Sequence, residues 1–164
     1  MIGRARLFPT TLVTALGATL LLSDAKADEV AKRTPPAAAP SCADPAAVSL
    51  KTENIVSQTQ GEMSTYSFRL VGTVQNLGIV DYKPAGGMTA VLTFGTKQLA
   101  TVDLPALAAG LSTDLRGQVS NWSPDEDAGD FALALRGVDA GDCVPADNAL
   151  TIAGPDLERT LRGK

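Results

Sequence analysis

Apolar and polar residues alternate along several short stretches between residues 48 and 153, with Gly, Pro, Asn or Asp between them. Alternation with a period of two is typical of β-strands that have one buried face. The strands predicted in this way cover residues 48–53, 66–75, 88–94, 98–104, 111–120, 131–136 and 148–153. The first and the last carry the weakest pattern, so we expect them to be short outer strands.

The clearest alternation runs from Leu111 to Ser120, where the odd-numbered positions through Val119 form the predicted buried face. In residues 98–104 the even-numbered positions, among them Val102, are the expected core face. Residues 66–74 present an apolar face on alternate positions in the same way. These assignments fix which side chains are expected in the core.

The turns between these stretches leave little sequence for helices. Only residues 105–109 and 155–163 could form a helical turn or two. Strands at spacings of about 10 to 15 residues, with turn residues between them, favour an antiparallel sandwich over βαβ units. We therefore predict an all-β fold, an immunoglobulin-like antiparallel Greek-key β-sandwich of about seven strands. A small barrel would satisfy the same alternation.

The N-terminus has the three parts of an export signal. Arg4 and Arg6 precede the mostly apolar run of residues 7–22, and Ala25 and Ala27 are small residues two apart. This arrangement predicts a signal peptide over residues 1–27, cleaved after Ala27. A membrane anchor is the alternative, but the apolar run is shorter than the roughly 20 residues that span a bilayer. We expect an exported protein, periplasmic or secreted, with no membrane insertion after cleavage.

The remaining chain divides at a change in composition. Residues 28–47 are rich in Pro and Ala, which predicts a disordered linker, because proline fixes φ and lacks an N–H donor. Such a linker is either a spacer that holds the domain away from a wall, membrane or partner, or a disordered N-terminal extension without a function of its own. We assign residues 48–154 to the sandwich and residues 155–164 to a C-terminal tail.

The charge balance bears on possible partners. The chain has a net charge of −4. Cleavage would remove three basic residues and one acidic residue, which makes the balance more negative. With no basic stripe, the sequence argues against nucleic acid as a partner. Aromatic residues are only 4% of the chain, too few for a platform of stacked rings that binds carbohydrate.

Turn motifs of this chain resemble those of CARDB-like domains, which are bacterial immunoglobulin-like or fibronectin-III-like modules associated with cell adhesion. The resemblance covers residues 68–148. It rests on the segment Gly72 to Gly78, with its V-x-N-x-G turn, on the segment Ala100 to Gly110, with its P-x-L-x-x-G turn, and on Asp147-Asn148. It implies a binding or structural module and names no ligand.

Two cysteines, Cys42 before the first predicted strand and Cys143 before the last, allow a single intrachain pairing. In an exported chain we expect them to form a disulfide. A redox role, which would lack a Cys-x-x-Cys arrangement, and an intermolecular link are the alternatives.

The chain contains no histidine, which excludes Ser-His-Asp and Cys-His catalysis and imidazole-based metal sites. A Gly-rich phosphate loop with a following Lys is also missing from the sequence. Glycosidase chemistry needs two carboxylates facing each other across a cleft, one of them protonated in an apolar pocket. Acidic residues clustered in loops do not provide that arrangement. We predict no enzymatic activity and no cofactor.

Acidic loops and two aromatic residues are the remaining candidates for a binding site. Solvated turns are the expected role of the acidic loops, and calcium binding is the weaker alternative because neither cluster has EF-hand spacing. The calcium candidates are Asp125, Asp127, Asp130, Asp139, Asp142 and Asp147. Tyr82 and Trp122 are candidates for contact with a partner, although Trp122 is expected to pack at the core or its rim.

These observations favour an exported, non-enzymatic binding or adhesion module of the bacterial cell envelope. Its partner would be a protein or a cell-surface polymer. The alternative is a structural or accessory subunit of a larger envelope assembly, such as an appendage or a secretion complex. Because a fold does not define a function, both remain hypotheses at this point.

Overall fold

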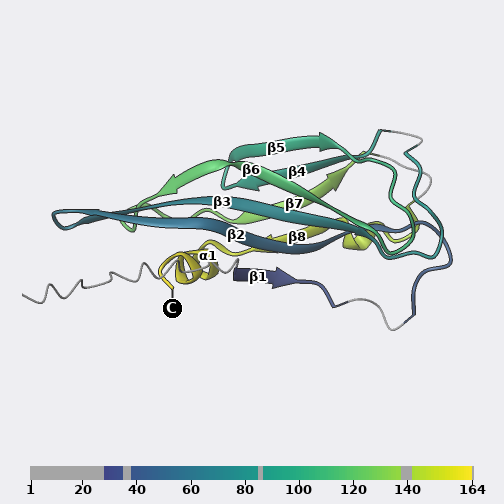
Figure 1. Ribbon diagram of the computed structural model, residues 1–164, viewed down its shortest axis with the longest axis horizontal. Helices are drawn as coiled ribbons and strands as arrows, with labels where there is room; N and C mark the ends of the chain where they lie inside the picture. The colour runs from purple at the N-terminus through teal and green to yellow at the C-terminus, as the bar shows by residue number, and fades with distance from the viewer. Residues whose placement is uncertain (1–27, 35–37, 85–86, 138–141, 164) are drawn as a thin grey trace, which may run out of the picture.

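A computed structural model describes residues 28–34, 38–84, 87–137 and 142–163. Two four-stranded sheets pack face to face, and all neighbouring strands within them are antiparallel (Figure 1). The first sheet has the order β1-β2-β3-β6 and the second the order β5-β4-β7-β8. The first sheet contains β1 (Asp28–Lys32), β2 (Pro45–Gln60), β3 (Met63–Asn76) and β6 (Ser112–Trp122). The second contains β4 (Thr89–Phe94), β5 (Lys97–Asp103), β7 (Phe131–Arg136) and β8 (Ala149–Ile152). The prediction of an all-β sandwich is confirmed.

The core lies between the two sheets and is filled by alternate residues of their strands. Phe68 and Leu70 of β3 face Leu92 of β4 and Leu133 of β7, all fully buried. A Cβ atom on Gly72 would lie 2.9 Å from a methyl group of Leu92 and 3.0 Å from one of Leu133. The absence of a side chain at this position therefore lets the sheets approach closely.

The predicted buried face of residues 111–120 is wrong at both ends. Leu115 is buried, but Leu111 is 59% exposed and Val119 is 56% exposed. Val71 of β3 pairs with Arg116 while Arg69 pairs with Val119, so β6 contains one extra residue between these pairs. This β-bulge reverses the side-chain alternation and turns Ser120 and Trp122 inward in place of Val119.

A second bulge changes the face of β5. Leu92 pairs with Ala100 and Thr93 with Gln98, which leaves Leu99 between the two pairs. Leu99 is 4% exposed, whereas Val102, expected in the core, is 48% exposed. A regular alternation across residues 98–104 therefore predicts the wrong core residue, because a bulge shifts the phase of the pattern.

The segment expected to be a disordered linker contains ordered structure. Strand β1 pairs with residues 49–52 of β2, and Pro45 is the first residue of β2. The Arg33 guanidinium donates to the carbonyl of Ala47 at 3.1 Å and to that of Ala149 at 2.8 Å, one in each sheet. Because no proline lies between residues 28 and 33, this part of the segment keeps the N–H donors that a sheet requires.

The C-terminal tail forms α1 (Gly154–Leu161), after a short 3-10 helix, η1 (Pro145–Asp147). Leu157 and Leu161 of α1 are buried against the core. Within the part of the chain that the structure describes, no helix is long and apolar enough to cross a membrane. The predicted signal peptide, residues 1–27, lies outside the described residues.

Candidate functional site

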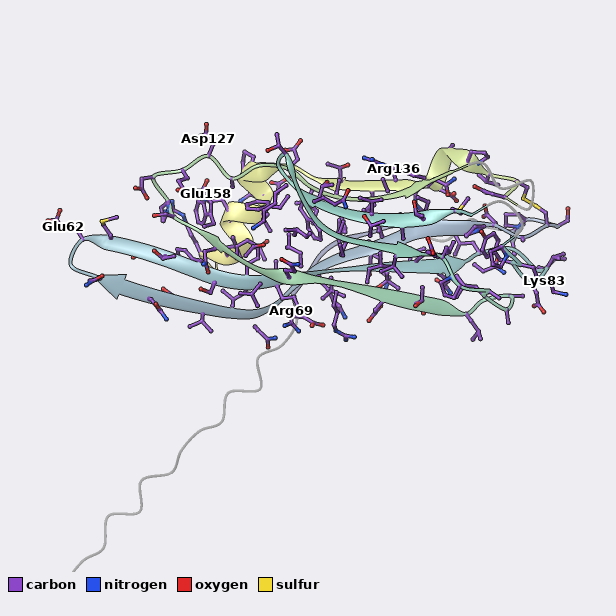
Figure 2. The ribbon with its side chains drawn as sticks, turned by 90° about the horizontal axis from the view of Figure 1, so that it is seen from above. Glu62, Arg69, Lys83, Asp127, Arg136 and Glu158 are labelled. Atoms are coloured by element: carbon purple, nitrogen blue, oxygen red, sulfur yellow. A yellow bond between two sulfur atoms is a disulfide. The ribbon has the colours of Figure 1, made fainter. Side chains whose placement is uncertain are left out.

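Strands β2 and β3 continue beyond the sandwich as a ribbon, here called the arm, which consists of residues 54–65 and is two-stranded from Gln58 to Thr65 (Figure 1). The strands pair from Val56 with Ser67 to Gln60 with Met63, and the turn includes Gly61 at a φ of 65°. Strand β6 accompanies β3 only as far as the pair of Tyr66 and Trp122. Figure 2 shows Glu62 at the tip of the arm and Lys83 at the opposite end of the molecule.

The arm begins at a bulge in β2. The pairing shifts between Glu53 and Val56, and Asn54 adopts a left-handed φ of 55°. Asparagine tolerates this conformation better than most residues, and such a bulge bends its strand. Beyond it every residue from Val56 to Gln60 is exposed, with Val56 at 51%. The local sequence thus directs this part of β2 away from the core.

One face of the arm carries a hollow of about 340 Å³ that lies over β2, β3 and β6. Five of its six lining residues carry an amide or a hydroxyl group, and none of the six side chains is charged. Within it, the Ser67 hydroxyl donates to Oδ1 of Asn121 at 2.6 Å. The lining residues are Gln58, Gln60, Met63, Thr65, Ser67 and Asn121. Such groups both donate and accept hydrogen bonds, so they suit a neutral polar ligand.

A second hollow, of about 450 Å³, is lined by Tyr66 and Ser64 of β3, the residues after β6 and the end of α1. Its charges have both signs. Arg162 pairs with Glu158 at 2.7 Å, and its guanidinium lies 5.6 Å from the centre of the Trp122 ring. Asp125 accepts a hydrogen bond from the Ser123 hydroxyl, which lowers the pKa of Asp125.

The outer edge of β2 is open along the arm. Strand β1 covers this edge only from Ser49 to Thr52. No other strand within the described ranges pairs with this side of β2 from Asn54 to Gln60. Backbone N–H and C=O groups of such an edge are available to another extended chain.

The two aromatic candidates for partner contact both lie in the interior. Tyr82 is 0% exposed, and its backbone exchanges hydrogen bonds with Leu107 at 2.8 and 3.1 Å. Trp122 is 2% exposed, and its indole N–H donates to the carbonyl of Glu126 at 2.9 Å. Neither side chain is on the surface, so neither is available to a partner in this structure.

At the end of the sandwich opposite the arm, Cys42 and Cys143 form the predicted disulfide, with their Cα atoms 6.3 Å apart (Figure 2). A backbone hydrogen bond lies beside the disulfide: the N–H of Cys143 donates to the carbonyl of Ala43 at 3.3 Å. The bridge closes a loop between residues 101 positions apart. It therefore ties the segment before β2 to the segment before β8.

Two of the calcium candidates lie beside this disulfide. Asp142 accepts hydrogen bonds from the N–H of Val144 at 3.1 Å and from the side-chain amide of Asn148 at 2.5 Å. Asp147 is 8% exposed. Asp130 is at the other end, where it accepts from the N–H of Gly154, and Asp139 lies outside the described residues.

Asp44, which the sequence did not single out, is the most deeply buried carboxyl group in this region. It is 1% exposed, and neither carboxyl oxygen has a hydrogen-bond partner. Burial raises the pKa of Asp44 to about 6, assisted by the charges of Asp147 and Asp142, while Arg33 opposes the shift. Burial also raises the pKa of Asp147. Both carboxyl groups therefore favour their protonated forms more than an exposed aspartate does.

A fully buried amide organises the backbone of the same end. Oδ1 of Asn76 accepts from the N–H groups of Asp44 at 2.9 Å and Gly78 at 3.1 Å. Its Nδ2 donates to the carbonyls of Val80 at 2.8 Å and Leu107 at 3.0 Å. A Cβ atom on Gly78 would lie 1.8 Å from the carbonyl oxygen of Cys42. The Asn-x-Gly turn of the sequence is thus a structural junction.

Metal binding has limited support in this arrangement. Among the side chains that the structure describes, no group of three or more Cys, Asp or Glu residues is placed to hold a metal ion. Comparisons with protein-family models, with curated proteins and with solved structures found no match to this chain. The arm therefore stands as the candidate site on its geometry alone.

Proposed function

We propose that this protein is an exported, non-enzymatic binding or adhesion module of the bacterial cell envelope, and that the arm is its contact surface. The observation that carries the proposal is the hollow lined by amides and hydroxyls on the face of the arm. The resemblance of its turn motifs to those of CARDB-like domains and the predicted signal peptide support the proposal from the sequence. We place the protein in the periplasm or outside the cell.

The lining of the hollow favours a neutral polysaccharide as the ligand. Gln58, Gln60 and Asn121 each carry a carbonyl oxygen and an NH₂ group, which together can bind two neighbouring sugar hydroxyls. An ionic polymer would leave its charges without partners there, a costly arrangement in a binding site. The hollow contains no aromatic ring, so hydrogen bonds rather than stacking would determine the affinity.

A binding assay on isolated envelope polysaccharide tests this proposal. We expect the exported protein to bind in a manner almost independent of salt, because no charge pairs contribute. A double variant, Gln58→Ala with Asn121→Ala, removes two amides from the hollow and should weaken binding by at least about tenfold, which corresponds to about 1.4 kcal/mol. The matched control removes two exposed glutamines elsewhere, Gln98→Ala with Gln118→Ala, and should bind as the native protein does.

Equal binding by the arm variant and the native protein would contradict this assignment of the site. If the native protein binds no polysaccharide and instead co-purifies with one protein in fixed stoichiometry, the result favours the alternative function. The protein would then be a structural or accessory subunit of a larger envelope assembly.

A further inference from the structure

The open edge of β2 differs from the outer strands β5 and β6 in its lack of charge, and from the uncharged outer strand β8 (Ala149–Ile152) in its length. Natural sheets protect their edges with charged residues, prolines or short strands. Strand β5 begins with Lys97 and ends with Asp103, and β6 carries Asp114 and Arg116. The stretch from Asn54 to Gln60 contains neither a charged residue nor a proline. Nothing in its sequence opposes the addition of another strand.

The same edge already accepts a strand. Strand β1 pairs antiparallel with β2, from Lys32 opposite Ser49 to Asp28 opposite Thr52. In the protein cleaved after Ala27, as we propose, a strand added from Ile55 onward would follow β1 along the edge, beyond the pair of Asp28 and Thr52. The arm extends outside the sandwich, so an added strand would not meet the core (Figure 1).

The partner that fits the open edge of β2 best is the same edge in a second copy of this chain. We infer that residues 55–59 pair with residues 55–59 of a second copy of this chain, antiparallel and centred on Ser57. Antiparallel pairing is compatible with a twofold axis, which gives a closed dimer. This inference goes beyond the proposed function, because it concerns the edge of the arm rather than the hollow on its face.

The pairing brings together compatible side chains. Ser57 lies opposite Ser57 of the second copy, Val56 opposite Gln58, and Ile55 opposite Thr59. No like charges face each other, and β-branched residues are among the favourable members of such cross-strand pairs. A chain with net charge −4 repels its own copy over much of its surface, so an uncharged stretch is where two copies can approach.

The nearest acidic residues are at the ends of the paired stretch. In this register Glu53 of one copy approaches the turn of the other, which contains Gly61 and Glu62. Lys51 and Arg116 already neutralise Glu53, at 3.4 and 3.6 Å. The pairing would join the first sheets of the two copies through their β2 strands, with the two disulfide ends pointing away from each other.

Sedimentation analysis of exported protein, expressed from its full coding sequence, tests the inference over a wide range of concentrations. We expect a reversible monomer and dimer equilibrium. Ser57→Lys places two lysines opposite each other at the twofold axis, and Ser57→Asp places two aspartates there. Each variant alone should associate at least about tenfold more weakly than the native protein, because like charges directly opposite each other are destabilising.

A mixture of the two variants provides the decisive measurement. Opposite charges then meet at the axis, so the mixture should recover dimers that neither variant forms alone. The control, Ser112→Lys, makes the same change on β6 at the far edge of the same sheet and should dimerise as the native protein does. A native protein that remains monomeric, or a mixture that does not recover, overturns the inference. Polysaccharide binding by a monomeric protein would leave the proposed function intact.

Discussion

The two ends of this sandwich use polar residues in opposite ways. At the disulfide end, Asn76, Asp44 and Asp147 are buried, and the amide of Asn76 makes four hydrogen bonds to the backbone. On the arm, Gln58, Thr59 and Gln60 are exposed. Polar groups therefore hold the loops together at one end and remain available for contacts at the other. The difference separates the part that maintains the fold from the part that we propose for binding.

The largest effect that distinguishes the two ends is expected from Asn76→Ala. It leaves the N–H groups of Asp44 and Gly78 and the carbonyl of Val80 without this partner, while the carbonyl of Leu107 still accepts from the N–H of Tyr82. Each unsatisfied buried group costs about 1–3 kcal/mol, so we expect a loss of roughly 4 kcal/mol in the free energy of unfolding. Chemical denaturation measures this loss. Asn121→Ala, the matched change beside the arm, should cost less than about 1 kcal/mol, since its amide is at the surface. Similar losses for the two variants would contradict the contrast between the ends.

A smaller effect is expected from the pH dependence of the disulfide end. The pKa of Asp44 is about 6 in the folded protein, above the ordinary value of 3.8. The folded state therefore holds this proton more tightly than the unfolded chain does. The resulting stabilisation is present in full below about pH 4 and is lost as the pH rises through about 6, a change of about 3 kcal/mol.

Asp44→Asn removes this titration, so its stability relative to the native protein should increase between about pH 4 and about pH 7. Urea unfolding at a series of pH values measures the difference. Asp125→Asn is the control at the other end, where the pKa of the carboxyl is lowered from 3.8, so its titration lies below this range and the difference from the native protein should change little between about pH 4 and about pH 7. A constant difference between Asp44→Asn and the native protein would show that the Asp44 carboxyl does not hold a raised pKa.

The smallest effect is expected within the arm. Thr59→Ala removes the contact between the hydroxyls of Thr59 and Ser64, which are 3.3 Å apart on the surface. We expect a change of less than about 0.5 kcal/mol in the free energy of unfolding, measured under the same conditions. A loss above about 1 kcal/mol would mean that the arm contributes to the stability of the fold as the disulfide end does.

Sequence alternation predicted the strands that have one buried face. Strand β7 was expected over residues 131–136 and has those bounds. Strand β3 was expected over residues 66–75 and spans Met63–Asn76. Strand β2 was expected to be short and weak over residues 48–53, yet it spans Pro45–Gln60. Its second half is exposed on both faces, so it carries no alternation by which a pattern could identify it.

The candidate site was harder to predict than the core. An uncharged run from Asn54 to Gln60 is the only local signal of the open edge, and it becomes meaningful only once the pairing partners of β2 are known. Tyr82 looked like a surface residue because it lies in a loop between turn residues. Its burial depends on pairing with Leu107, which is 25 residues away and follows a different strand. The residues next to Tyr82 in the sequence do not indicate that contact.

The two hydrogen bonds of Arg33 have a consequence for the order of folding. One joins Arg33 to Ala47 nearby, and the other joins it to Ala149, which is 116 residues further along the chain. The second contact cannot form until nearly the whole chain has been synthesised. Folds dominated by such distant contacts form slowly, over milliseconds to seconds. The N-terminal segment can therefore pair with β2 early, but its link to the second sheet through Ala149 is completed only after the C-terminal strand is in place.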